Sequence, residues 1–306
     1  MRLSAAIAML VVVLDLSARG QAVREVAITF DDLPIAGVLP HDVAESRAIT
    51  GKLLAAIAAH HVPAIGFVNE MKLGENGETL LRAWLDAGLD LGNHTYSHID
   101  VHRASIADVE ADVLRGETVT RHLLRERGRA LRFFRHPFLH TGRDLATKER
   151  LEAFLREHGY RVAPVTIDNE EYIFAAAYDR AGARGDTGLR ARIAAAYVPY
   201  MENKFAFFER NERELFGRSI RHVLLLHANP LNADHFDALA RMLEDRGYRF
   251  IPLERALEDP AYQSPDTYTG PGGITWLHRW AITKGVEKRF FAGEPEAPRF
   301  VAEAAQ

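Results

Sequence analysis

Short apolar runs that look like strands alternate along this chain with longer amphipathic segments, and this alternation restricts the fold more than any other feature. Strands that alternate with helical patterns indicate βαβ units and a parallel sheet. We therefore expect an α/β fold, a distorted (β/α) barrel of about seven parallel strands in a single domain with insertions. The expected strands are 26–30, 64–68, 89–92, 131–134, 162–167, 223–226 and 249–252, and the expected helices are 44–60, 78–87, 106–127, 143–158 and 233–246.

The length of the chain, 306 residues, allows one large domain or two small ones, and single barrels of this size are common. We expect a catalytic domain over residues 23–258, interrupted by a charged and aromatic insertion at about 173–221, in which helices are expected. A C-terminal extension over 259–306 begins with a loop rich in Pro, Gly and Asp and ends in an Ala/Glu/Pro tail. We expect that tail to be mobile.

The first residues have the pattern of a signal peptide, which we assign to residues 1–22. Arg2 precedes an apolar stretch at 5–14, and small residues follow at Gly20 and Ala22. The apolar stretch is too short for a comfortable membrane span. We expect an exported protein, periplasmic or extracellular, with no stable membrane insertion after cleavage. A buried first element and an uncleaved anchor are the alternatives.

The composition excludes several kinds of chemistry. The chain contains no cysteine, so it has no zinc–thiolate site, disulfide or thiol nucleophile. Any bound metal must be held by histidine and carboxylate. The formal net charge of −4 gives no basic field, which makes nucleic acid a poor candidate partner.

Two short segments carry candidate metal ligands. Asp31 and Asp32 end an apolar strand, and two adjacent carboxylates repel each other unless a cation compensates them. His94 and His98, spaced by four, are expected on one face of a helical turn. A His-His-Asp triad leaves an open position for water, and the second acid can serve as general base. Taken alone, the histidines could be surface or capping residues, and the two acids could belong to a turn before Pro34.

Polar side chains also follow several of the other expected strands. Chemistry in such barrels lies at the carboxyl ends of the strands, so these residues are expected at one rim. Each has a structural alternative: Arg135 as a strand end, Asp168 as a turn cap, His227 as a core histidine. The residues expected at this rim are Asp31, Asp32, His94, Arg135, Asp168 and His227.

Five motifs, in order from about residue 25 to residue 257, resemble those of the polysaccharide deacetylase family, the NodB-homology domain of carbohydrate esterases. Each motif is weak by itself, but their order at strand ends is specific. The fourth ends in Glu171-Tyr172 where the family more often has Asp-Trp, which affects the wall of the groove rather than the chemistry. The motifs are Thr29–Asp32, His94–His98, Arg135–Phe138, Asp168–Tyr172 and Leu225–His227.

The resemblance implies a metal site and a base. Asp32, His94 and His98 would bind one divalent ion, usually zinc in this family. Asp31 would be the base that takes a proton from the attacking water. Arg135 would pair with Asp31 and keep that carboxylate ionised and oriented.

The resemblance also implies an acid and a substrate pocket. The backbone N–H of Phe138 would stabilise the oxyanion. His227 would protonate the leaving group, with Asp168 hydrogen-bonded behind it. Leu225 would line the pocket for the acetyl methyl group, and Tyr172 would form a wall of the groove.

These expectations describe an exported, metal-dependent N-deacetylase of acetylated amino sugars in peptidoglycan, chitin-like or poly-N-acetylglucosamine substrates. Zinc is expected, although a His-His-Asp site also accepts cobalt, nickel or manganese. An O-acetyl carbohydrate esterase and a hydrolase of C–N bonds in small amides are the enzymatic alternatives. A catalytically silent wall-binding module is the alternative from another class.

Overall fold

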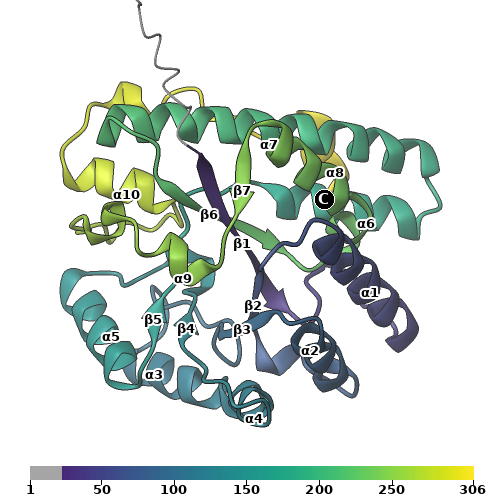
Figure 1. Cartoon of the computed structure of the whole chain (residues 1–306), viewed down its shortest axis with the longest axis horizontal. Coiled ribbons are helices and arrows are strands. Elements are labelled where there is room, and N and C mark those ends of the chain that lie inside the picture. Colours follow the sequence, from purple (N-terminus) through teal and green to yellow (C-terminus); the bar gives the residue numbers. More distant parts are fainter. Residues whose placement is uncertain (1–22) are drawn as a thin grey trace, which may run out of the picture.

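Seven parallel strands form one curled sheet in the computed structural model, as the alternation predicts (Figure 1). The structure describes residues 23–306, so the expected signal peptide lies outside the described residues. Among residues 23–306, no helix is long and apolar enough to cross a membrane. The strands are β1 (Arg24–Leu33), β2 (Ile65–Val68), β3 (Asp90–Asn93), β4 (Phe133–Phe134), β5 (Arg161–Val162), β6 (Arg221–His227) and β7 (Tyr248–Phe250).

The segment that follows β5 at one edge of the sheet reaches β6 at the other edge, which makes the sheet a distorted barrel. The strand order is β5-β4-β3-β2-β1-β6, and β7 pairs with β1. After β5 the chain crosses to β6, where Ile167 pairs with Leu224 and the N–H of Leu225 donates to the carbonyl of Ile167 over 3.2 Å. The expected strand at 162–167 is therefore two short pieces, because its middle passes from one edge to the other.

Apolar residues of the strands fill two cores on opposite faces of the sheet. Along β1, Val26, Ile28 and Phe30 pack into the larger core, whereas Ala27 belongs to the smaller one. Successive side chains of a strand point to opposite faces, so the continuous apolar run of β1 supplies both cores. The smaller core also contains Phe67, Phe133 and Val223, from three other strands.

Helices cover the outside of the sheet, and one expected helix is divided in two. The expected helix at 106–127 ends at Gly116, where a Cβ atom would lie 2.3 Å from the carbonyl carbon of Thr95. Only glycine allows this approach, which brings the α3–α4 junction against the loop that carries His94 and His98. The helices of this layer are α1 (Val43–Ala59), α2 (Gly77–Asp86), α3 (Ile106–Arg115), α4 (Thr118–Arg125), α5 (Leu145–Glu157) and α8 (Pro230–Asp245).

The insertion forms two helices, α6 (Glu171–Ala183) and α7 (Thr187–Phe216), as expected. In Figure 1, α7 crosses the whole upper side of the molecule. Most of its aromatic side chains are buried, Tyr197 and Phe205 completely. The insertion is thus packed into the main core and is not a detached lobe.

The C-terminal extension is ordered, and the expectation of a mobile tail is wrong. Val301 is fully buried against the larger core, because the tail folds into an amphipathic helix that packs on α6. Trp276 and Trp280 are also buried and attach the extension to the fold. The elements after β7 are α9 (Leu253–Ala256), η3 (Pro260–Gln263), α10 (Trp276–Thr283), η4 (Lys288–Phe291) and α11 (Arg299–Ala304). A loop precedes α10, as expected. Two further short 3₁₀ helices, η1 (Glu70–Lys72) and η2 (Pro137–Leu139), lie earlier in the chain.

Candidate active site

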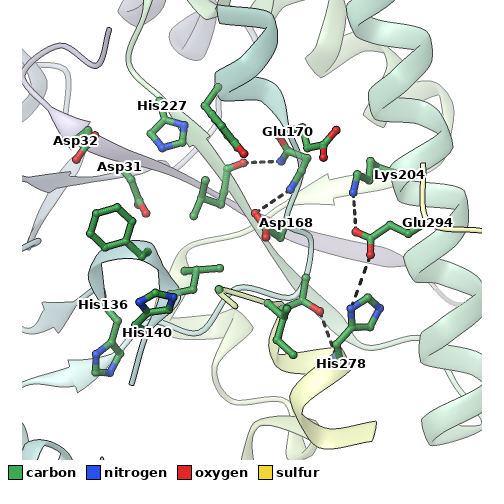
Figure 2. Close-up of a pocket in the computed structure, with 18 of the residues that line it drawn as sticks. Asp31, Asp32, His136, His140, Asp168, Glu170, Lys204, His227, His278 and Glu294 are labelled. Atoms are coloured by element: carbon green, nitrogen blue, oxygen red, sulfur yellow. Dashed lines mark hydrogen bonds and ion pairs between the residues drawn. The ribbon is translucent and has the colours of Figure 1, made fainter. Parts of the chain in front are cut away.

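A cavity of about 700 Å³ opens at the carboxyl ends of the strands and is lined by the expected site residues. Figure 2 labels four of them: Asp31, Asp32, Asp168 and His227. The volume of the cavity is that of a site for a small molecule or part of a chain. Arg135 is the exception: it lies beneath the floor, completely buried. The predicted residues that line the cavity are Asp31, Asp32, His94, His98, Phe138, Asp168, Tyr172, Leu225 and His227.

Asp32, His94 and His98 bring three ligand atoms together. Oδ1 of Asp32 lies 3.7 Å from Nε2 of His94 and 3.6 Å from Nε2 of His98. Tetrahedral zinc with bonds of about 2.0–2.1 Å separates its ligand atoms by roughly 3.3–3.5 Å. Within residues 23–306 this buried Oδ1 has no hydrogen-bond partner. The donor set therefore fits a divalent ion with little adjustment.

The local backbone aims both histidines, but not through the helical turn that we expected. Residues 94–98 form a loop in which Thr95 and His98 have positive φ angles of 64° and 59°. Oδ1 of Asn93 accepts the N–H of Thr95 over 2.7 Å and holds the first of these bends. Nδ1 of His94 lies 2.9 Å from the carbonyl of Arg135, so that nitrogen donates and leaves Nε2 free as a ligand.

The charge states of these groups suit metal binding. Burial lowers the pKa of His94 and of His98 to about 4, so both rings are neutral near pH 7. Burial alone would raise the pKa of Asp32, but His94 and the Lys72 ammonium outweigh it and hold that pKa below its usual value. Nζ of Lys72 lies 2.9 Å from Oδ2 of Asp32. Sequence reasoning missed this contact, since Lys72 lies in none of the motifs.

Asp31 lies beside the triad as an almost completely buried carboxylate. Its Oδ1 is 3.9 Å from Nε of Arg135, and Arg135 donates from Nη2 to the hydroxyl of Thr29 over 2.9 Å. Burial raises the pKa of Asp31, and the charges of Arg135 and His227 offset part of that rise. Arg135 is therefore near Asp31 as expected, but burial makes Asp31 a stronger base than Arg135 alone would allow.

His227 is paired with Glu171, not with Asp168, which corrects the expected arrangement. Nδ1 of His227 lies 2.8 Å from Oε2 of Glu171, and the Glu171 carboxylate is fully buried. The amide groups of Asn229 and Asn232 donate to its other oxygen. Asn232 in turn accepts the hydroxyl of Tyr197, from α7, over 2.8 Å. The second acid of the fourth motif thus supports His227, and the insertion supports that acid.

The partner of His227 determines its protonation. Burial lowers the pKa of His227, but the hydrogen bond and charge of Glu171 outweigh burial and raise it to about 9. His227 is therefore an imidazolium near neutral pH and presents its Nε2–H to the cavity. That is the form that can donate a proton to a leaving group.

Glu171→Gln is expected to move the alkaline limit of activity to lower pH. An acid acts below its pKa, so activity should fall as pH rises through about 9 in the parent protein. Without the carboxylate the pKa of His227 returns toward its ordinary value, and the fall begins earlier. The measurement is the pH profile of kcat. Asp168→Asn is the control and should leave the alkaline limit unchanged. If Asp168→Asn shifted the limit and Glu171→Gln did not, Asp168 would be the partner of His227 after all.

The segment that carries Phe138 has a special backbone. Phe138 and Leu139 have positive φ angles of 56° and 55°, which residues with bulky side chains seldom adopt. The Phe138 ring is half exposed and packs edge-on against His98, with ring centroids 4.4 Å apart. Leu225 contributes an apolar side chain to the floor of the cavity, and Tyr172 is more than half exposed beside it.

Arg279 of the extension holds this strained segment, a contact that the sequence did not indicate. Its guanidinium donates to the carbonyl of Leu139 over 3.1 Å and to the hydroxyl of Thr141, and it pairs with Asp266 at 2.9 Å. The Arg279 side chain is 1% exposed. Strained backbone persists only where its surroundings hold it, and here the extension does so.

Arg279→Met is expected to lower the free energy of unfolding by about 3–5 kcal/mol, because it breaks a buried pair and leaves Asp266 and the Leu139 carbonyl without their donor. Urea denaturation measures the change. Arg299→Met removes a similar pair from the surface, where the arginine side chain is 91% exposed. That control should cost less than about 1 kcal/mol. Equal changes in the free energy of unfolding for the two substitutions would show that the buried contacts of Arg279 stabilise the protein no more than a surface ion pair does.

Comparison with known proteins supports the resemblance seen in the motifs. Residues 18–163 match the model of the family described as polysaccharide deacetylase. The first three motifs lie within this match, whereas the fourth and fifth lie beyond it and join them in space. The resemblance seen in the motifs is confirmed over residues 18–163, the part of the chain that matches the family model.

Two curated relatives and one solved structure are similar to this chain. A chitin deacetylase from Colletotrichum lindemuthianum is 28% identical over 48% of this chain and 52% of its own length. A peptidoglycan-N-acetylglucosamine deacetylase from Bacillus cereus is 30% identical over 37% of this chain and 36% of its own length. The chain thus matches about half or less of these relatives.

The fold is shared with a mutant of a CE4 family pseudoenzyme from Bacillus anthracis whose enzymatic activity was restored. The TM-score is 0.51 at 13% identity, over 77% of this chain and 68% of the other. The expected distorted barrel is confirmed by this likeness and by the sheet itself.

Proposed function

We propose that this protein is a metal-dependent hydrolase that removes acetyl groups from N-acetylated amino sugars of an oligosaccharide or polysaccharide. The observation that carries the proposal is the grouping of a three-ligand site, a buried acid and an imidazolium around one cavity. The names of the two curated relatives support acetylated amino sugars as the substrate class. The signal-like pattern at 1–22 supports export.

Asp32, His94 and His98 would hold the ion, for which zinc is the best candidate given two imidazoles and a carboxylate. A divalent ion bound there supplies Lewis acidity, which polarises a carbonyl and makes water a better nucleophile near neutral pH. Asp31 lies beside the triad with a raised pKa, and within residues 23–306 its Oδ1 has no hydrogen-bond partner, so it can take the proton of the attacking water.

The remaining roles fall to groups on the other sides of the cavity. The N–H of Phe138 would donate to the oxyanion that develops on the acetyl carbonyl. His227 would donate its Nε2 proton to the departing amine, with Glu171 stabilising the imidazolium. Leu225 would contact the acetyl methyl group, and Tyr172 would flank the sugar. Residues 23–258 would form the catalytic domain, and the extension at 259–306 would complete its cavity.

Acetate release from an N-acetylglucosamine tetramer tests the proposal. The protein is assayed as purified, after removal of metal by a chelator, and after reloading with zinc. We expect acetate release that disappears on chelation and returns with zinc. Release that is unaffected when the metal has been removed, or no release by the zinc-loaded protein, would contradict the proposal.

A further inference from the structure

The cavity continues away from the candidate metal ligands into a polar region lined by residues 168–170, the insertion and the extension. In Figure 2 this region lies opposite Asp32 and His227, with Asp168 between the two parts. All residues of this polar region lie beyond the segment 18–163 that matches the family model. The polar region consists of Asp168, Glu170, Lys204, Thr275, His278 and Glu294.

An ion pair between a buried lysine and a partly exposed glutamate lies on one side of the polar region. Nζ of Lys204 lies 2.6 Å from Oε1 of Glu294, and the lysine side chain is 4% exposed while the glutamate is 34% exposed. An ammonium in such a place loses most of its hydration, so it needs its partner. Because Glu294 neutralises it, the pair offers donors and acceptors without a net positive charge.

His278 lies beside the Lys204–Glu294 pair, and its hydrogen bonding fixes its tautomer. Nδ2 of Asn211 lies 3.2 Å from Nε2 of His278, and since an amide nitrogen only donates, this Nε2 accepts. The proton is therefore on Nδ1, which faces Oε2 of Glu294 at 3.9 Å. Burial lowers the pKa of His278 to about 4, consistent with a neutral ring.

Asp168 is available to a ligand because Glu171 has taken the place beside His227. Within residues 23–306 its carboxylate accepts one hydrogen bond, from the N–H of Asn169 over 2.8 Å. Burial raises the pKa of Asp168 to about 6, so at neutral pH it is a carboxylate that gains from any further donor. Figure 2 places it between the reaction centre and Lys204.

We propose that this polar region is a binding subsite for a second, neutral or amine-bearing sugar residue next to the acetylated one, held by Asp168, Lys204 and Glu294. The proposal rests on the proposed function. Sugar hydroxyls both donate and accept, which matches a site that alternates carboxylates with an ammonium. A sugar that carries a carboxylate is disfavoured, because the three acids Asp168, Glu170 and Glu294 outnumber the one lysine.

The test compares two substrates in Lys204→Met and Glu294→Gln. One is the N-acetylglucosamine tetramer, and the other is 4-nitrophenyl acetate, which has no sugar. The measured quantity is the ratio of kcat/KM for the tetramer to kcat/KM for the ester. We expect this ratio to fall about tenfold or more in each variant, chiefly through KM, as when a hydrogen bond to a charged group is lost.

Lys52→Met is the matched control. It breaks an ion pair of the same length, 2.6 Å to Asp234, that lies outside the cavity. Its ratio should equal that of the parent protein. An unchanged ratio in Lys204→Met and Glu294→Gln, whether or not both activities fall, would overturn the subsite and leave the pair as a structural link. No acetate from the tetramer with the zinc-loaded parent would instead refute the proposed function, and the subsite with it.

Discussion

Asp31→Asn is expected to reduce kcat for acetate release by about 10²–10⁴-fold, the usual contribution of a general base. Asparagine keeps the shape of the side chain but cannot accept the proton of the attacking water. The ion should remain bound, because its candidate ligands are Asp32, His94 and His98. Acetate release and metal content, measured on the same preparation, separate the two effects.

Asp86→Asn provides the control for Asp31→Asn, because Asp86 is an acid whose side chain is 68% exposed. It should retain the activity of the parent protein. A metal-loaded Asp31→Asn protein with undiminished kcat would show that Asp31 is not the base. Loss of the metal in this variant would show that Asp31 belongs to the ligand set.

His227→Ala is expected to lower kcat on the amide of an N-acetylated sugar by about 10²–10⁴-fold. An amine departs poorly unless it is protonated, and His227 presents the proton because Glu171 keeps it an imidazolium. An alcohol departs more easily, so hydrolysis of an O-acetyl sugar should decline much less. The measurement is kcat for both substrates in the parent protein and the variant.

Assays of the parent protein and of His227→Ala on both substrates also separate N-deacetylation from hydrolysis of O-acetyl esters. His122→Ala, at a histidine whose side chain is 67% exposed, controls for the loss of an imidazole. An amide activity that survives in His227→Ala would remove the histidine from the mechanism. A parent protein that hydrolyses only the ester would favour the O-acetyl esterase.

The fold could be predicted from the sequence because strand and helix periods alternate so regularly. β1 and β6 are long apolar runs and were found with small errors at their ends. The boundaries failed where a local pattern was overridden by distant contacts. The break at Gly116 depends on the loop at Thr95, and the helix α11 is stabilised by burial of Val301 against α6.

The sequence likewise predicts the site residues that are placed by local segments, but not those that are placed by distant contacts. Asp31 and Asp32 lie at the carboxyl end of β1, and His94 and His98 come from the loop directly after β3, so the barrel itself brings them together. The choice between Asp168 and Glu171 could not be made from the sequence. Both acids lie in one motif, and only the path of the backbone into α6 decides which faces His227.

The contributions of remote elements were not predictable at all. Lys72, Lys204 and Arg279 come from elements far from the motifs, and nothing in their local sequence marks them. The roles of Lys204 and Arg279 depend on how the insertion and the extension pack, which is settled by tertiary contacts.

The ligand set is the central claim, and the number of zinc ions bound per chain tests it most directly. Equilibrium dialysis followed by elemental analysis should find one ion per chain in the parent protein and in His140→Ala, whose histidine lines the cavity outside the triad. Asp32→Ala and His94→Ala should bind none at the same free zinc concentration. A parent protein without zinc, or triad variants that bind it as the parent does, would contradict the account.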